Sequence, residues 1–443
     1  MGETEGREAA ARRLASPRVL DVDTLLDDPE TRIVVCCGSG GVGKTTTAAA
    51  LGLRAAERGR KVVVLTIDPA RRLAQSMGID SLDNVPRRVK GTDGDGELHA
   101  MMLDMKRTFD EVVEAHADPE RAAVILANPF YQSLSAGFAG TQEYMAMEKL
   151  GQLRARDEWD LIVVDTPPSR SALDFLDAPK RLGSFLDGRL IRLLTAPAKL
   201  GGRAGMAFLN VGMSMMTGTL GKLLGGQLLK DVQTFVAAMD TTFGGFRTRA
   251  DATYKLLQAP GTAFLVVAAP ERDALREAAY FVERLAAERM PLVGLVLNRV
   301  HGSGAARLSA ERALDAAENL ADPRIVDQGG GKNGLRNSPD TYGSSRPPTP
   351  EAAAGAGTSD EGSPADEERS ADRLTAGLLR LHAERMHLLA REQRTRDRFT
   401  ARHPEVAVVD VPALPGDVHD LTGLRDIGDR LAAGTPTEHV EPS

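Results

Sequence analysis

The sequence predicts an α/β fold in which a mostly parallel sheet is flanked by helices and carries an inserted helical subdomain. Short apolar, β-branched runs alternate with helical patterns along the chain, as is typical of parallel strands joined by helices. These runs contain few polar side chains, which is expected of strands covered on both faces. Two long stretches lack such runs and have a helical pattern throughout, so we assign them to the inserted subdomain.

Seven runs qualify as strands of the predicted sheet. They are Ile33–Cys37, Val62–Ile67, Leu98–Leu103, Leu161–Val164, Ala263–Ala269, Leu292–Leu297 and Val406–Val411. The first is followed by an Ala-rich helical stretch, Thr46–Arg58, which we expect to end at Gly59 because glycine readily adopts the left-handed conformation after a helix. A charged helix over about Asp372–Arg398 is expected to lead into the last strand.

These elements group into four parts of the chain. An N-terminal extension covers residues 1–30, and the domain that carries the sheet covers residues 31–104, 158–170, 259–327 and 373–435. The inserted helical subdomain covers residues 105–157 and 171–258. Residues 328–372 are rich in Gly, Pro, Ser and acidic side chains, so they bury too little apolar surface to offset the entropy of ordering and are expected to be disordered.

The composition indicates a globular protein without a nucleic-acid partner. The 443 residues are 42% hydrophobic and 26% charged, and the formal net charge is −7, with no basic stripe that would bind nucleic acid. No run of about 20 apolar residues predicts a transmembrane segment, and the first residues lack the apolar region of a signal peptide. Two adjacent cysteines, Cys36 and Cys37, are expected in the core. We therefore expect a cytoplasmic protein, or one that is peripheral at the membrane.

A glycine-rich loop between the first strand and its helix predicts a nucleoside triphosphate site. The motif G-x-x-x-x-G-K-[ST] is formed by Gly38, Ser39, Gly40, Gly41, Val42, Gly43, Lys44, Thr45 and Thr46. Glycines allow successive backbone N–H groups to converge on phosphate oxygens, and the helix directs its N-terminal dipole at the same anion. Lys44 brings a positive charge to the β- and γ-phosphates, and the Thr45 hydroxyl is a ligand for Mg²⁺. The fold is therefore predicted to be that of a P-loop NTPase, with ATP and Mg²⁺ as cofactors.

Two aspartates follow other predicted strands. Asp165 ends the strand Leu161–Val164, where an acidic residue would contact the Mg²⁺ shell; the alternative, a simple cap of the strand, is less favoured. Asp68 comes directly after the second strand, where it could activate the attacking water. Because Pro69 favours the first position of a helix, Asp68 could instead be only an N-cap.

In these segments the chain resembles the ArsA-type ATPases, which include the arsenite-pump ATPase and the guided-entry ATPase for tail-anchored membrane proteins. The resemblance rests on GSGGVGKTT, LTIDPARRLAQSMG, DLIVVDTPPS, VVAAPERDALRE with LVGLVLNRV, and VAVVDVPALPGDVHDLTGLRDI, which occur in the family's order. It implies an ATPase that hydrolyses ATP·Mg²⁺ and uses dimer closure to drive a helical subdomain that binds a client or partner.

The resemblance also implies roles for individual residues. Asp68 matches the family's water-activating aspartate, and Asp165 matches its Mg²⁺-linked aspartate. Asn298 matches an asparagine that reads adenine, with a capping role as the alternative. Pro412 begins a loop, Pro412–Gly416, that would close over the base.

The phosphate loop departs from the family at one position. Ser39 stands where the family usually has a lysine that reaches the nucleotide of the partner subunit. The chain is therefore expected either to form a homodimer or to pair with a paralogous ATPase. In the second case it would be a nucleotide-binding scaffold subunit that hydrolyses little ATP itself.

The helical subdomain contains a segment that bears on the client. The charge-free, Met-rich segment Gly205–Gly221 would suit a groove for a hydrophobic client or a membrane protein, but Met and Leu at helical spacing more often form core. An arsenite or anion pump is less favoured, because arsenite requires thiolates and the chain has only two cysteines.

Overall fold

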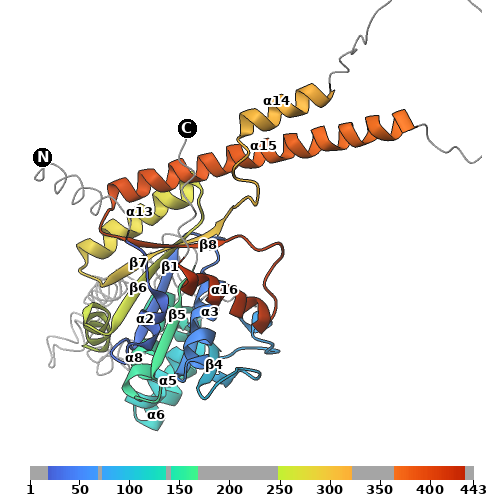
Figure 1. Cartoon of the computed structure of the whole chain (residues 1–443). Coiled ribbons are helices and arrows are strands. Elements are labelled where there is room, and N and C mark those ends of the chain that lie inside the picture. Colours follow the sequence, from blue (N-terminus) through green and yellow to red (C-terminus); the bar gives the residue numbers. More distant parts are fainter. Residues whose placement is uncertain (1–17, 68–71, 136–140, 168–247, 322–363, 435–443) are drawn as a thin grey trace, which may run out of the picture. The chain divides into compact units, whose positions relative to one another are not determined.

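The computed structural model describes residues 18–67, 72–135, 141–167, 248–321 and 364–434. These residues form two compact units. The first comprises the described residues up to Gly302 and from Glu392 onward, and the second comprises the described residues between Ser303 and Arg391. The first unit contains the sheet and the predicted nucleotide site (Figure 1).

The described part of the first unit is built on an eight-stranded sheet in the order β3-β4-β2-β5-β1-β6-β7-β8. The strands are β1 (Ile33–Gly38), β2 (Lys61–Thr66), β3 (Arg87–Arg88), β4 (Glu97–Met102), β5 (Leu161–Asp165), β6 (Thr262–Ala268), β7 (Leu292–Val300) and β8 (Ala407–Pro412). All neighbouring strands are parallel except β3, which is antiparallel to β4. The seven predicted strands are therefore confirmed, and only the two-residue edge strand β3 was not predicted.

Helices connect most of the strands, and those of the first unit cover the sheet. They are α2 (Val22–Asp27), α3 (Lys44–Glu57), α4 (Arg72–Ser76), α5 (Met105–His116), α6 (Pro119–Leu126), α7 (Pro129–Ser135), α8 (Thr141–Ala155), α13 (Arg272–Ala287), α14 (Ala310–Ala321), α15 (Pro364–Arg402) and α16 (Leu421–Ala433). Residues 248–258 are also helical. Helix α3 is followed by Gly59 with φ +97°, as predicted, but it begins at Lys44, two residues before the expected start.

The sheet separates two apolar cores. Val34 and Val62 belong to a core with α2, α3 and α16, whereas Val35 and Val63 belong to a core with α5, α8 and α13 on the opposite face (Figure 1). Because successive residues of a strand point to opposite faces, the adjacent cysteines divide between the two cores. Both cysteines are buried and unbridged, as predicted.

The helical character predicted for residues 105–157 is confirmed by α5, α6, α7 and α8. The segment Gly205–Gly221 and most of the second predicted helical stretch lie outside the described residues. Helix α15 begins at Pro364, eight residues before the predicted start at Asp372. Its first residues, Pro-Ala-Asp-Glu-Glu, explain the earlier start, because proline and acidic residues are favoured in the first turn of a helix.

The second unit contains α14 and the first part of α15. Small side chains are buried on both helices, namely Ala313, Ala317, Ala376 and Ala383. Ring nitrogen Nε2 of His382 lies 2.8 Å from the carbonyl of Leu308, which links α15 to the segment before α14. Within the described ranges, no helix of either unit combines the length and the apolar character that a membrane span requires.

Candidate nucleotide-binding site

The predicted site residues that the structure describes lie at one edge of the sheet, where the parallel strands end. Strand β1 lies between β5 and β6, with β2 next to β5 and β7 next to β6. The carboxyl ends of parallel strands meet at the same edge, which is where α/β proteins bind their ligands. Hydrogen bonds in the structure link Thr45 to Asp165, and Asn298 to the loop that follows β1.

The loop leaves the sheet at a position that only glycine can occupy. Gly38, the last residue of β1, has φ +150°, and a Cβ atom there would lie 2.1 Å from the Val267 carbonyl oxygen of β6. Beyond it, Gly40 and Gly41 are exposed, whereas Ser39 and Val42 are buried. The tip of the loop therefore presents backbone without side chains to solvent, as a phosphate-binding loop requires.

The N-terminus of α3 carries no side-chain cap. Its N-cap residue is Gly43, at φ +94°, which makes no side-chain cap hydrogen bond. Aspartates cap the N-termini of four other helices, namely Asp21 on α2, Asp104 on α5, Asp118 on α6 and Asp420 on α16. Because a helix N-terminus attracts anions, the uncapped first turn of α3 is suited to a phosphate, which a capping aspartate would repel.

The Lys44 side chain folds back over the loop. Its ammonium Nζ donates a hydrogen bond of 2.7 Å to the backbone carbonyl of Ser39, and only 6% of the residue is exposed. A positive charge at a buried position is favoured by a neighbouring anion, so this geometry fits the predicted phosphate contact. The Ser39 contact uses its carbonyl, which any residue at that position would provide.

Asp165 joins three elements through its carboxylate. The side chain is fully buried, and its Oδ2 accepts hydrogen bonds from Thr45 Oγ1 at 2.7 Å and from Thr66 Oγ1 at 2.9 Å. Thr45 belongs to α3 and Thr66 ends β2, so one carboxylate connects the phosphate loop with two strands. A carboxylate beside two hydroxyl oxygens is a donor set that suits Mg²⁺.

Asn298 lies under the loop. Its Nδ2 donates a hydrogen bond of 2.8 Å to the Val42 carbonyl, and its Oδ1 accepts one of 3.0 Å from the backbone N–H of Arg299. A Cβ atom on Gly43 would lie 2.2 Å from the same Nδ2, so the glycine makes room for the asparagine. The adenine contact predicted for Asn298 is not tested by these bonds and stays a prediction.

The remaining predicted residues are placed only in part. Pro412 ends β8 opposite Val300, near the same end of β7 as Asn298. Thr46 is half-buried in the first turn of α3. Asp68 lies outside the described residues, so its predicted role as the water-activating group stays a prediction.

Two threonines of the site were not assigned hydrogen-bond partners from the sequence. Thr66 hydrogen-bonds Asp165, and Thr166 donates to the Cys36 carbonyl through its Oγ1 at 2.9 Å. Each stands within two residues of an aspartate at the end of a strand, in the segments Leu-Thr-Ile-Asp and Asp-Thr-Pro-Pro. A hydroxyl beside a carboxylate at the end of a strand was the signal that could have identified them.

The two cysteines are unsuited to bind a soft ion. Burial raises the pKa of the Cys37 thiol to about 12, and burial together with the charge of Asp165 raises the pKa of Cys36 well above its ordinary value. Both are therefore neutral thiols near pH 7, whereas thiolates are the ligands for soft ions. Among the described side chains, no group of three or more His, Cys, Asp or Glu residues could hold a metal ion.

Comparison with known proteins agrees with this geometry. The family described as the anion-transporting ATPases matches residues 31–307, which is more than half of the chain. The chain is 30% identical to ATPase GET3 of Malassezia globosa over 165 residues, covering 37% of this chain and 47% of that protein. It is 25% identical to ATPase GET3 of Podospora anserina over 332 residues, covering 71% and 91%. For ATPase GET3 of Ajellomyces dermatitidis the identity is 26% over 283 residues, covering 63% and 76%.

Proposed function

Because the chain belongs to the anion-transporting ATPase family and is therefore an ATP hydrolase, we propose that it uses the loop between β1 and α3 to bind ATP with Mg²⁺. Hydrolysis of the bond between the β- and γ-phosphates would drive closure of two subunits and a change in the helical segments. The observation that carries the proposal is the pair of hydrogen bonds from Thr45 and Thr66 to Asp165, which ties the phosphate loop to two neighbouring strands.

ATP and Mg²⁺ fit the residues of the site. The uncapped first turn of α3, the exposed glycines of the loop and the Lys44 ammonium are all suited to phosphate oxygens. Thr45 and Asp165 would hold the metal, which when bound would neutralise charge on the phosphate oxygens.

Individual residues of the chain would then have separate roles in hydrolysis. Lys44 would stabilise the negative charge that develops on the phosphate oxygens, and the backbone N–H groups of the loop would hold the phosphates in place. Asp68, which follows β2 by two residues, would accept a hydrogen bond from the attacking water and orient it. Asn298 and Pro412 would contact the adenine.

The first test is release of inorganic phosphate from ATP and Mg²⁺ by the purified full-length chain. We expect Lys44→Ala to abolish phosphate release, and Asp68→Asn to retain ATP binding but lose turnover. The control is Lys90→Ala, which removes an exposed lysine in the segment before β4 and should leave the rate unchanged. Normal phosphate release by Lys44→Ala would contradict the proposed site. If the wild-type chain binds ATP but hydrolyses none, the scaffold alternative would replace the proposal.

The client is proposed to be an apolar helix of a membrane protein. Support comes from the relatives named ATPase GET3 and from the Met-rich composition of Gly205–Gly221. The Asp68→Asn variant in ATP is the suitable bait, because it should hold the closed state. We expect it to retain membrane proteins with a terminal apolar helix more strongly than Lys44→Ala does. Equal retention by the two variants would contradict a client that depends on ATP.

A further inference from the structure

One side chain from α8 reaches the end of β2. Gln142, in the first turn of α8, donates a hydrogen bond of 3.1 Å from its Nε2 to the backbone carbonyl of Ile67. Ile67 is the residue after β2, and its own N–H donates a hydrogen bond of 3.0 Å to the carbonyl of Asp165. The Ile67 backbone is therefore held by β5 through its N–H and by α8 through its carbonyl.

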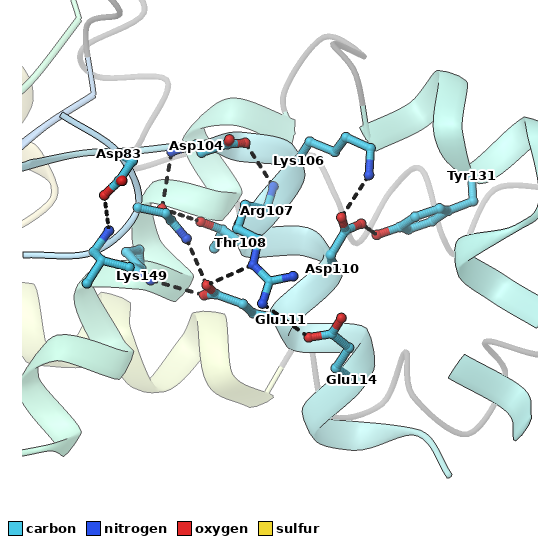
Figure 2. A network of polar contacts seen from close by, with 12 residues as sticks. Asp83, Asp104, Lys106, Arg107, Thr108, Asp110, Glu111, Glu114, Tyr131 and Lys149 are labelled. Atoms are coloured by element: carbon cyan, nitrogen blue, oxygen red, sulfur yellow. Dashed lines mark hydrogen bonds and ion pairs between the residues drawn. The ribbon is translucent and has the colours of Figure 1, made fainter. Parts of the chain in front are cut away.

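Helix α8, which carries Gln142, is held to neighbouring helices by charged side chains. Glu148, almost fully buried, accepts hydrogen bonds from Arg249 Nε at 2.9 and 3.1 Å and from the Tyr144 hydroxyl at 3.2 Å. Lys149, also buried, forms an ion pair of 3.0 Å with Glu111 of α5. Figure 2 shows this pair within a wider polar network in which Arg107 also approaches Glu111. Helix α8 is thus tied to the helical residues 248–258 through Arg249 and to α5 through Glu111.

The hydrogen bond from Gln142 holds the residue that separates Thr66 from Asp68. Ile67 lies between Thr66, which hydrogen-bonds Asp165, and Asp68, the next residue in the sequence. By holding the Ile67 carbonyl, the Gln142 side chain limits rotation of the peptide group that joins Ile67 to Asp68. The Gln142 amide is partly buried and does not belong to the apolar core that contains the Ile67 side chain.

We propose that Gln142 is a positioning residue for ATP hydrolysis, which holds the exit of β2 in the orientation that the reaction requires. The inference rests on the proposed function. Its consequence is that α8, and through Arg249 the helical residues 248–258, control the geometry of the site from outside the phosphate loop. A displacement of α8 would break the Gln142 hydrogen bond and slow hydrolysis without removing any group that contacts the phosphates.

The test uses two variants of the full-length chain and a matched control. Gln142→Glu replaces the amide donor by a carboxylate, and Gln142→Met keeps the length of the side chain without donor or charge. The control is Gln152→Glu, which makes the same change at a half-buried position of the same helix. We expect kcat for ATP hydrolysis to fall about tenfold in both Gln142 variants, the effect of one lost hydrogen bond. KM for ATP should stay within about twofold of wild type, since the groups that bind ATP are intact.

Wild-type kcat in Gln142→Met would overturn the positioning role, and so would a rise in KM that matches the fall in kcat. A defect equal to that of Gln152→Glu would show a general effect of altering α8 and would also overturn it. If the wild-type chain releases no phosphate beyond Lys44→Ala, the proposed function itself fails, and this inference fails with it.

Discussion

At the scale of single residues, the nucleotide site depends on Gly43 having no Cβ atom. Gly43 places its Cα where a Cβ would lie 2.2 Å from Asn298 Nδ2, and it has φ +94°. The sequence motif specifies a glycine here, but it does not reveal which side chain needs the space. The structure identifies that side chain as Asn298, which comes from a strand 256 residues away from Val42 along the chain.

Gly43→Ala should therefore be more harmful than the same change elsewhere in the loop. We expect the free energy of unfolding to fall by about 2 kcal/mol and ATP binding to be lost, because backbone strain and the clash with Asn298 act together. Gly41→Ala is the matched control, since Gly41 also has a positive φ of +77° but a Cβ there meets nothing within 4 Å. Urea unfolding and ATP titration would measure both effects. Equal destabilisation by the two variants would show that the clash contributes nothing.

At the scale of elements, one arginine connects three helices. Arg54 of α3 donates hydrogen bonds of 2.5 and 2.8 Å to the carboxylate of Asp23 on α2, and one of 2.7 Å to Asp429 on α16. These helices share an apolar core on one face of the sheet. The hydrogen bonds from Arg54 lower the pKa of the Asp23 carboxyl below its ordinary value of 3.8.

This interaction should contribute to stability only while Asp23 is ionised. Because its pKa is lower in the folded chain than in the unfolded one, its contribution is complete above the unfolded value and is lost as the pH falls through the folded value. We expect Asp23→Asn to reduce the free energy of unfolding by about 1 kcal/mol at pH 7, and the difference from wild type to disappear at strongly acidic pH. Urea unfolding between pH 7 and pH 3 measures this, with the exposed Asp95→Asn as control. A difference that does not change with pH would contradict the assigned role.

The elements also show how far local sequence patterns can predict structure. The seven parallel strands were predicted to within three residues at their ends, because each is a short apolar run bounded by polar residues. The edge strand β3 has only two residues, both exposed, so it leaves no apolar pattern to detect. The start of α15 was placed too late because its first residues, Pro-Ala-Asp-Glu-Glu, contain no large apolar side chain that would mark an apolar stripe.

At the scale of the whole molecule, the position of Ser39 bears on how many subunits are needed for hydrolysis. In the family that the chain resembles, a lysine at this position reaches the nucleotide of the partner subunit. Ser39 contributes its backbone carbonyl to Lys44, and a change of its side chain leaves that hydrogen bond available. The Ser39 side chain itself cannot supply the positive charge.

We expect Ser39→Lys to raise the rate of ATP hydrolysis at least fivefold and to make the rate per subunit increase with protein concentration. The physical reason is that a lysine would stabilise the developing charge on the partner's phosphates, an interaction that exists only in a dimer. Ser39→Met, of similar length but uncharged, is the control. Phosphate release measured over a range of protein concentrations would decide the matter, and equal rates for the lysine and methionine variants would contradict the prediction.

The sequence by itself determined the fold class, the strands, the phosphate loop and the aspartate that ends β5. These features are local, since a strand shows in its apolar run and a phosphate loop in the spacing of its glycines and lysine. Only the tertiary structure decided which residues meet. The partners of Asp165 lie 99 and 120 residues away, and Gln142 lies 75 residues from Ile67. Such pairs follow from the order of strands in the sheet, which is set by burial of the whole core and leaves no pattern in any short segment.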